Sequence, residues 1–144
     1  MKAKQFYASK AWRYLSRYTL IHYANSDGYV KCSTSGVYMA CNDKRMHAGH
    51  FIKVFDGSKT NMAVALEFEN IAPQCHQDNI YGGGKPDIMK EWLIKQHGLE
   101  KIEKLLIKKH NICKLGKFEL DYYGKYWKQQ FDLIVERTGY NPWK

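Results

Sequence analysis

Apolar residues recur at helical spacing in both flanks of the chain but not in its centre. The stretches 4–24 and 117–136 carry apolar side chains three and four residues apart, with charged side chains on the opposite side. From Tyr29 to Phe68 the chain instead has short runs of β-favouring residues, interrupted by Asn, Asp and Gly turns. A centre of short strands between flanking helices predicts an α+β fold.

The positions of glycine and proline predict where several elements begin and end. After Gly82-Gly83-Gly84, Pro86 begins a helix that Gly98 ends, and a second helix follows from Leu99 to about His110. We expect extended segments at 29–31, between Tyr38 and Phe55, and from Met62 to Phe68. The apolar stripe expected on the last helix is Leu120, Tyr123, Tyr126, Trp127, Phe131 and Ile134.

The net charge favours an extended anionic partner. The 144 residues suffice for one domain with a core and carry a formal charge of +9. Residues 1–31 and 85–144 each contribute +5, whereas residues 32–84 carry four basic and five acidic side chains. We therefore expect the flanks to bind nucleic acid. A phosphate that reacts in the centre would need a divalent cation to neutralise it.

The cysteines favour metal binding or burial over disulfides. No apolar run approaches the roughly 20 residues that span a bilayer, and no signal-peptide core follows the first lysines. We expect a cytoplasmic protein with no membrane partner. In such a reducing compartment, disulfides between Cys32, Cys41, Cys75 and Cys113 are the weaker interpretation.

Metal-binding and acid–base residues are concentrated between Cys32 and Asn79. Three motifs follow one another: Cys32-Ser-Thr-Ser-Gly, then His47-Ala-Gly-His50-Phe, then Glu69-Asn70-Ile-Ala-Pro-Gln-Cys75-His-Gln-Asp-Asn79. With the Gly-rich turn and the helices behind it, this order resembles the HNH (His-Me finger, ββα-metal) nucleases. More narrowly, residues 29–138 resemble the NinG (Rap) family of phage recombination endonucleases.

The length and the resemblance imply a domain organisation and a reaction. The length favours a single domain, 1–144, which we divide into an N-terminal helical arm (1–28), the HNH-like core that the resemblance implies (29–98) and C-terminal helices (99–144). The implied activity is hydrolysis of phosphodiester bonds in branched or recombining DNA, such as Holliday junctions and D-loops, in the host cytoplasm if the chain is phage-encoded. The alternatives are a DNA-binding module that has lost catalysis and a less selective HNH nuclease. A homodimer would supply the two cuts that a symmetric junction requires.

Residue by residue, the resemblance assigns three catalytic positions. His50 matches the general base, Asn70 the asparagine that fixes a loop, and Asn79 a metal ligand on the helix. A neutral imidazole can accept a proton from water near pH 7, and an amide oxygen can bind a hard cation. The expected cation is Mg²⁺ or Mn²⁺, with Asn79, His47 and His50 as its candidate ligands.

The chain departs from the HNH pattern at Gly49, where many members carry an acidic or imidazole ligand. His47 is the nearest replacement. In a regular strand, however, His47 and His50 point to opposite faces. We therefore expect His47 to reach the metal only through a bulge, which Gly49 would permit.

A second departure concerns zinc. Two Cys-x-x-Cys knuckles often hold structural zinc in such folds, but here they read Cys32-x-x-Ser35 and Cys75-x-x-Asp78. Four-thiolate zinc is therefore excluded. Two alternatives stay open: a knuckle held by packing alone, or a mixed zinc site that uses Cys32, Cys75, Asp78 and either Cys41 or His76.

The first helical stretch carries the candidate DNA contacts. Lys10, Arg13 and Arg17 are spaced by three and four residues, opposite the apolar stripe. We expect the three cations to face one track of phosphates together.

Overall fold

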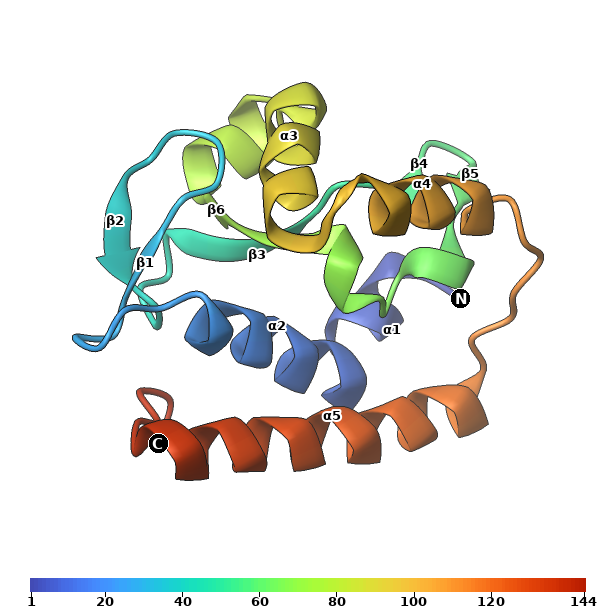
Figure 1. The fold of residues 1–144 in the computed structure, drawn as a ribbon. Coiled ribbons are helices and arrows are strands. Elements are labelled where there is room, and N and C mark those ends of the chain that lie inside the picture. Colours follow the sequence, from blue (N-terminus) through green and yellow to red (C-terminus); the bar gives the residue numbers. More distant parts are fainter.

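The computed structural model describes all 144 residues and places the elements in layers (Figure 1). The helices are α1 (Ala3–Tyr7), α2 (Lys10–His22), α3 (Pro86–His97), α4 (Leu99–Lys108) and α5 (Lys117–Thr138). The strands are β1 (Tyr29–Lys31), β2 (Tyr38–Ala40), β3 (Met46–His50), β4 (Phe55–Asp56), β5 (Lys59–Thr60) and β6 (Ile71–Cys75). Two 3-10 turns, η1 (Met62–Val64) and η2 (Phe68–Asn70), and one π-helical turn, η3 (Gln77–Tyr81), complete the chain. The expected α+β fold class is confirmed.

The pair β3–β6 forms the centre of the molecule. The strands are antiparallel and pair from Met46 with Cys75 to His50 with Ile71, without an inserted residue. Helix α2 covers the face that includes Ile71, whereas α3 and α4 pack against Ala72 on the other face. Because both faces are covered, every residue of β6 is buried. The other strands form two separate pairs, β1–β2 and β4–β5.

Helix α2 is packed on two sides, with β3–β6 above it and α5 below it in Figure 1. Ala11 and Leu15 are fully buried between these layers. The two helices come close at Gly124 of α5, where an added Cβ would lie 3.3 Å from the Cβ of Lys10. The N-terminal segment therefore forms part of the core.

The single helix expected over 4–24 is two helices. Ser9 separates them: its hydroxyl accepts a hydrogen bond from the Trp12 backbone N–H at 3.2 Å and donates one to the Phe6 carbonyl at 2.6 Å. Ser9 thus caps the N-terminus of α2 and ends the preceding turn. The break lets α1 fold back so that Phe6 is buried in the core that contains Leu15.

The extended segment expected from Met62 to Phe68 is wrong, because this stretch contains the turns η1 and η2. The buried Asn70 side chain holds the loop in this shape. Its amide nitrogen donates to the carbonyls of Ile52 at 3.0 Å and Val64 at 3.1 Å, and its oxygen accepts from the Ile52 N–H at 2.7 Å. The strand lies further along, at 71–75, where no alternation of polar and apolar residues marked it.

The predicted helices at 86–98, 99–110 and 117–136 are present with small shifts at their ends. On α5, the expected stripe is partly wrong: Tyr123 and Tyr126 are exposed, and Gly124 lies in the contact with α2. Trp127, Phe131 and Ile134 are buried as expected. None of the helices combines the length and the apolarity needed to cross a bilayer.

Candidate functional site

His50 lies at the end of β3, on the face that α2 covers. Its Nε2 is 2.9 Å from the Ala65 carbonyl oxygen. Since a carbonyl can only accept, Nε2 carries the proton, and Nδ1 is left without a hydrogen-bond partner. The loop that supplies Ala65 is the one held by Asn70. Asn70 therefore fixes the orientation of the His50 ring from a distance.

Aromatic rings surround His50. Trp12 stacks on it with ring centroids 4.6 Å apart and an interplanar angle of 22°, and Phe6 and Tyr7 lie at 6.2 and 6.5 Å. Burial lowers the pKa of His50 to about 4, against the smaller opposing effect of the Ala65 hydrogen bond. The imidazole is therefore neutral at pH 7 with a lone pair on Nδ1, but a ring with this pKa is a weak base for as long as it stays covered.

His47 and Asn79 meet on the opposite face of β3. Asn79 lies in η3, directly after β6, and its Nδ2 donates to Nδ1 of His47 at 3.0 Å. The register is regular, without the bulge that would bring His47 and His50 to one face of the strand. Burial lowers the pKa of His47, and the neighbouring His76 lowers it further. His47 is thus favoured in its neutral form, with the lone pair of Nδ1 taken up by the hydrogen bond from Asn79.

Gly49 lies against Asn79. A Cβ added at Gly49 would lie 3.2 Å from Asn79 Oδ1 and only 2.7 Å from Oε1 of Gln74. Position 49 therefore has no space for the ligand side chain that the HNH pattern places there. Two amide oxygens converge on that space instead.

A cavity of about 350 Å³ opens along β3, between α2 and η3. It is lined by Tyr7, Trp12, Ser16, Arg17, Leu20, Met46, His47, Ala48, Asn79 and Trp143. The guanidinium of Arg17 lies 5.4 Å from the ring centre of Trp143. His50 does not line the cavity, and no hydrogen bond joins it to His47 or Asn79. Its ring lies behind Trp12, which stacks on His50 and also lines the cavity.

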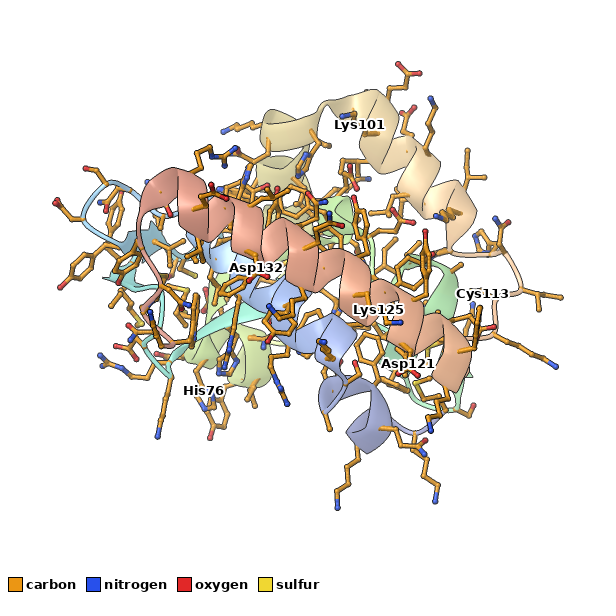
Figure 2. All side chains as sticks on the ribbon, turned by 90° about the horizontal axis from the view of Figure 1, so that it is seen from below. His76, Lys101, Cys113, Asp121, Lys125 and Asp132 are labelled. Carbon is orange, nitrogen blue, oxygen red and sulfur yellow. The ribbon has the colours of Figure 1, made fainter.

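The three candidate DNA contacts of α2 lie in different surroundings. Arg17 is half-buried in this cavity, whereas Lys10 and Arg13 are exposed. Lys10 lines a separate hollow of about 300 Å³ with Lys125 and Lys128 of α5. Lys125 lies on the side of α5 that faces the viewer in Figure 2. The structure thus places one cation beside His47 and Asn79, and the others along the surface.

The knuckle positions come together in a second group. The ligand atoms of Cys32, Cys75 and Asp78 all lie within 4.8 Å of one another, so this group could hold a metal ion. Ser35 is the fourth member, with its Oγ 3.7 Å from Cys75 Sγ. The two expected substitutes do not join it. Cys41 is buried near Tyr140, and His76 packs edge-on against His47.

Hydrogen bonds already satisfy the knuckle group. The sulfur of Cys32 accepts from the N–H groups of Ser35 at 3.4 Å and Cys75 at 3.2 Å. Burial raises the pKa of Cys32, but hydrogen bonds from Ser35, Thr34 and Cys75 outweigh it and bring the pKa to about 7. Asp78 accepts from the Thr34 hydroxyl at 2.7 Å and lies 3.6 Å from Lys85 Nζ. The knuckle shape is thus held by the protein itself.

The two groups suit different ions. The thiols of Cys32 and Cys75 favour a soft ion such as zinc, although a hydroxyl in the fourth position is a weak ligand. His47 and Asn79 carry one imidazole nitrogen and one amide oxygen, without a carboxylate, and a cation on Nδ1 of His47 would have to replace the hydrogen bond from Asn79 Nδ2. This neutral pair fits Mn²⁺, which accepts imidazole, better than Mg²⁺, which prefers oxygen ligands. The anionic oxygen of a bound phosphate would complete either ion's coordination.

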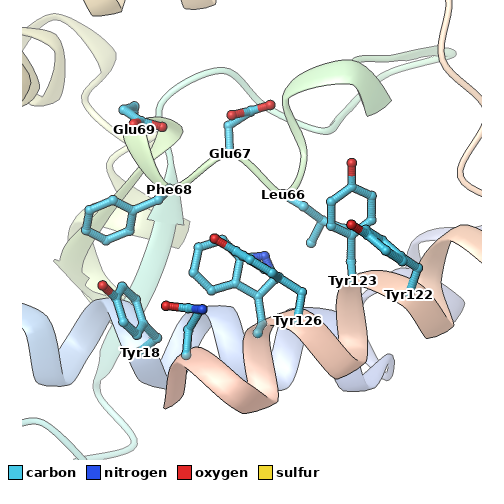
Figure 3. A pocket seen from close by; sticks show the side chains of 10 residues that line it. Tyr18, Leu66, Glu67, Phe68, Glu69, Tyr122, Tyr123 and Tyr126 are labelled. Carbon is cyan, nitrogen blue, oxygen red and sulfur yellow. The ribbon is translucent and has the colours of Figure 1, made fainter. Parts of the chain in front are cut away.

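The hollow between α5 and the 66–69 loop has a different character (Figure 3). It measures about 510 Å³ and is lined by Tyr18, Leu66, Glu67, Phe68, Glu69, Tyr122, Tyr123, Tyr126, Trp127 and Gln130. Its only charged residues are two glutamates, one of which, Glu67, is paired with Lys108, so that no cation lines the hollow to attract a phosphate. Cys113 lies apart from all of these sites, exposed in the linker between α4 and α5 (Figure 2). The cavity beside His47 is therefore the better candidate for DNA.

Sequence reasoning missed two features of this site. It treated Trp12 only as a packing residue, although Trp12 contacts His50 and the cavity. It gave no role to Gln74, whose pairing with His47 across the strands follows only from the register. Comparison of the chain with protein-family models, with curated proteins and with solved structures gave no match. Function must therefore be argued from the geometry.

Proposed function

We propose that the protein is a metal-dependent endonuclease of the HNH type that hydrolyses phosphodiester bonds in branched or recombining DNA. One observation carries the proposal. An antiparallel pair and the helical turn after it hold a neutral His50, with Nδ1 free, and a His47–Asn79 pair on the two faces of one strand. A candidate base and a candidate metal-binding residue thus lie three residues apart on one strand, with Trp12 between the base and the cavity.

His50 acts as the general base in this proposal. The Ala65 carbonyl fixes the tautomer, so that Nδ1 is the atom that removes a proton from water. Trp12 holds the ring from one side and keeps it poorly solvated, which keeps it unprotonated at neutral pH. Because Trp12 also lines the cavity, a shift of this side chain on DNA binding would open the path between base and phosphate.

His47 and Asn79 would hold the divalent cation. When bound, Mn²⁺ or Mg²⁺ supplies positive charge for the scissile phosphate and for the leaving oxygen. Arg17 lines the same cavity and adds a fixed positive charge to it. The preference for branched DNA rests on the resemblance to the NinG family, whereas the net charge of +9 supports DNA in general.

Cleavage of DNA under defined metal conditions tests the proposal. A synthetic four-way junction, a linear duplex of the same sequence and a supercoiled plasmid are incubated with the protein in Mn²⁺, in Mg²⁺ and in EDTA. We expect cleavage of the junction in Mn²⁺, less in Mg²⁺ and none in EDTA. Equal cleavage of all three DNAs would replace the junction preference by a less selective nuclease.

A second candidate function is DNA binding without catalysis. The observations that favour it are the glycine at position 49 and the position of His50 behind Trp12. The same experiment distinguishes the two functions. Tight junction binding in a gel-shift assay, without cleavage in any metal, would establish the binding module and exclude the nuclease.

A further inference from the structure

Gln74 carries a buried polar atom that the protein leaves without a partner. The side chain is fully buried in β6, and its Oε1 accepts no hydrogen bond. A buried amide oxygen without a partner costs about 1–3 kcal/mol, so native proteins rarely keep one without a role. Gln74 is paired with His47 in the register and therefore lies on the same face of the sheet as His47.

The orientation of the Gln74 amide follows from its neighbours. Its Nε2 donates to the Gly84 carbonyl at 2.7 Å and to the Thr34 hydroxyl at 3.2 Å. A carbonyl oxygen can only accept, so the reverse orientation would place two acceptors against each other. Oε1 must therefore face Gly49, where it lies 2.7 Å from the position of an added Cβ.

Gly49 and Gln74 thus complement each other. The space that a side chain at position 49 would fill is occupied by Gln74 Oε1, with Asn79 Oδ1 next to it. The same Gln74 amide also reaches Thr34, which donates to Asp78 of the knuckle. Gln74 therefore connects the knuckle group to the His47–Asn79 pair.

We infer that Gln74 supplies the oxygen donor that Gly49 cannot, so that the cation site consists of His47, Asn79 and Gln74. The inference rests on the proposed function, because it assumes a divalent cation at His47 and Asn79. It explains why a glycine stands at a position where the resemblance implies a ligand. It also explains the buried oxygen without a partner, since the cation would be its partner.

Binding of Mn²⁺, measured from the EPR signal of the free ion with and without four-way junction DNA, tests this inference without reference to cleavage. The variant Gln74→Met keeps the length of the side chain and removes the oxygen. We expect it to weaken Mn²⁺ binding by roughly tenfold or more, a typical effect for residues that bind or orient a metal. Gln129→Met, on the exposed side of α5, is the matched control and should bind Mn²⁺ as wild type does.

A double variant tests the complementarity of positions 49 and 74. Gly49→Asp alone should weaken Mn²⁺ binding, because its Cβ would displace Gln74 Oε1. Combined with Gln74→Ala, which vacates the space, the same aspartate should restore Mn²⁺ binding and improve Mg²⁺ binding, since a carboxylate suits a hard cation. This result does not depend on the folding of Gln74→Met, and thermal unfolding verifies the fold of each variant.

The outcomes separate the inference from the proposed function. If Asn79→Ala loses Mn²⁺ while Gln74→Met binds it within twofold of wild type, the cation site stands and Gln74 is not part of it. If Gly49→Asp with Gln74→Ala binds no better than Gln74→Ala alone, the complementarity is also wrong. If wild type binds no Mn²⁺ even with the junction present, the metal-dependent function itself falls.

Discussion

The knuckle group and the His47–Asn79 group differ in how completely the protein satisfies their polar atoms. In the knuckle, Cys32 accepts two backbone N–H groups, and Asp78 is bonded to Thr34 and paired with Lys85. Beside His47, a cavity is open and Gln74 Oε1 has no partner. Structural metal sites are closed, whereas catalytic sites keep an open position. Access does not separate the two groups, because Ser35, Cys75 and Asp78 also line a cavity, of about 720 Å³. Their hydrogen bonds do, and on these we propose that the knuckle has a structural role and the His47–Asn79 pair a functional one.

Converting the knuckle into a complete zinc site should give the largest effect. Purified wild-type protein should contain substoichiometric zinc, since two of four thiolates are missing. The Ser35→Cys, Asp78→Cys variant should bind one zinc tightly, because Ser35 Oγ lies 3.7 Å from Cys75 Sγ, near the ~3.8 Å edge of a tetrahedron with Zn–S bonds of about 2.3 Å. Free zinc a thousandfold above Kd would stabilise this variant by about 4 kcal/mol.

Elemental analysis and thermal unfolding with and without EDTA measure both effects. Cys113→Ser serves as the common background, because this exposed thiol lies outside the group. One tightly held zinc in the wild type would reverse the comparison: the knuckle would then be a metal site despite its hydrogen bonds.

Removing the proposed base, which lies behind the cavity, should have the next largest effect. We expect His50→Ala to lose about 10²–10⁴-fold in single-turnover cleavage, the usual contribution of general base catalysis. Junction affinity should stay nearly unchanged, because the His50 ring lies behind Trp12 and does not line the cavity. A cleavage rate within about tenfold of wild type, a loss of only ~1.4 kcal/mol, would show that another group is the base.

The sequence predicted those parts of the fold that local chemistry determines. Helix α3 begins at Pro86 and ends before Gly98 as expected, since the backbone preferences of proline and glycine act whatever the surroundings. The strand at 71–75 was missed because both of its faces are covered, so its residues do not alternate. The loop before it was missed because the Asn70 side chain, bonded to distant backbone, determines its shape.

In the candidate site, too, the sequence predicted individual residues but not the contacts that depend on the tertiary fold. The motif order placed His50, Asn70 and Asn79, and the structure brings Asn79 to His47 and Asn70 to the loop that orients His50. The partnership of Gln74 with Gly49 depends on strand register and on the carbonyl of Gly84. No spacing within the sequence encodes such a contact.

The burial of His50 predicts a pH dependence of stability. Its pKa is about 4 in the folded protein and near 6.5 when unfolded, so between these values only the unfolded chain binds the proton. Stability from this group is therefore present above pH 6.5 and lost as the pH falls towards 4, by at most about 3 kcal/mol because the side chain is only half-buried. His50→Gln should remove this contribution.

Urea unfolding of wild type and His50→Gln at several pH values between 7 and 4 measures the effect. The fall in unfolding free energy should be smaller in the variant by up to the stated amount. His22, His47 and His97 remain in both proteins, so their own titrations cancel in the difference. Parallel curves would mean that water reaches the His50 ring and that the two faces of β3 are equally open.

The smallest expected effects concern the cations of α2, of which only Arg17 lines the open cavity. Arg17 lines the cavity, whereas Arg13 lies one turn earlier and is exposed. Each cation that neutralises a phosphate contributes about 0.9 to the slope of log K against log salt, so replacing Lys10, Arg13 and Arg17 together should flatten it by roughly 2 to 3.

We expect Arg17→Ala also to slow cleavage of bound junction, because its charge lies beside His47 and Asn79. Arg13→Ala, the matched control, should change only the slope. Junction affinity at five salt concentrations in the His50→Ala background and single-turnover cleavage in the active protein separate the two. If the triple variant leaves affinity and slope unchanged, these side chains only solvate the helix, and DNA must approach by another surface.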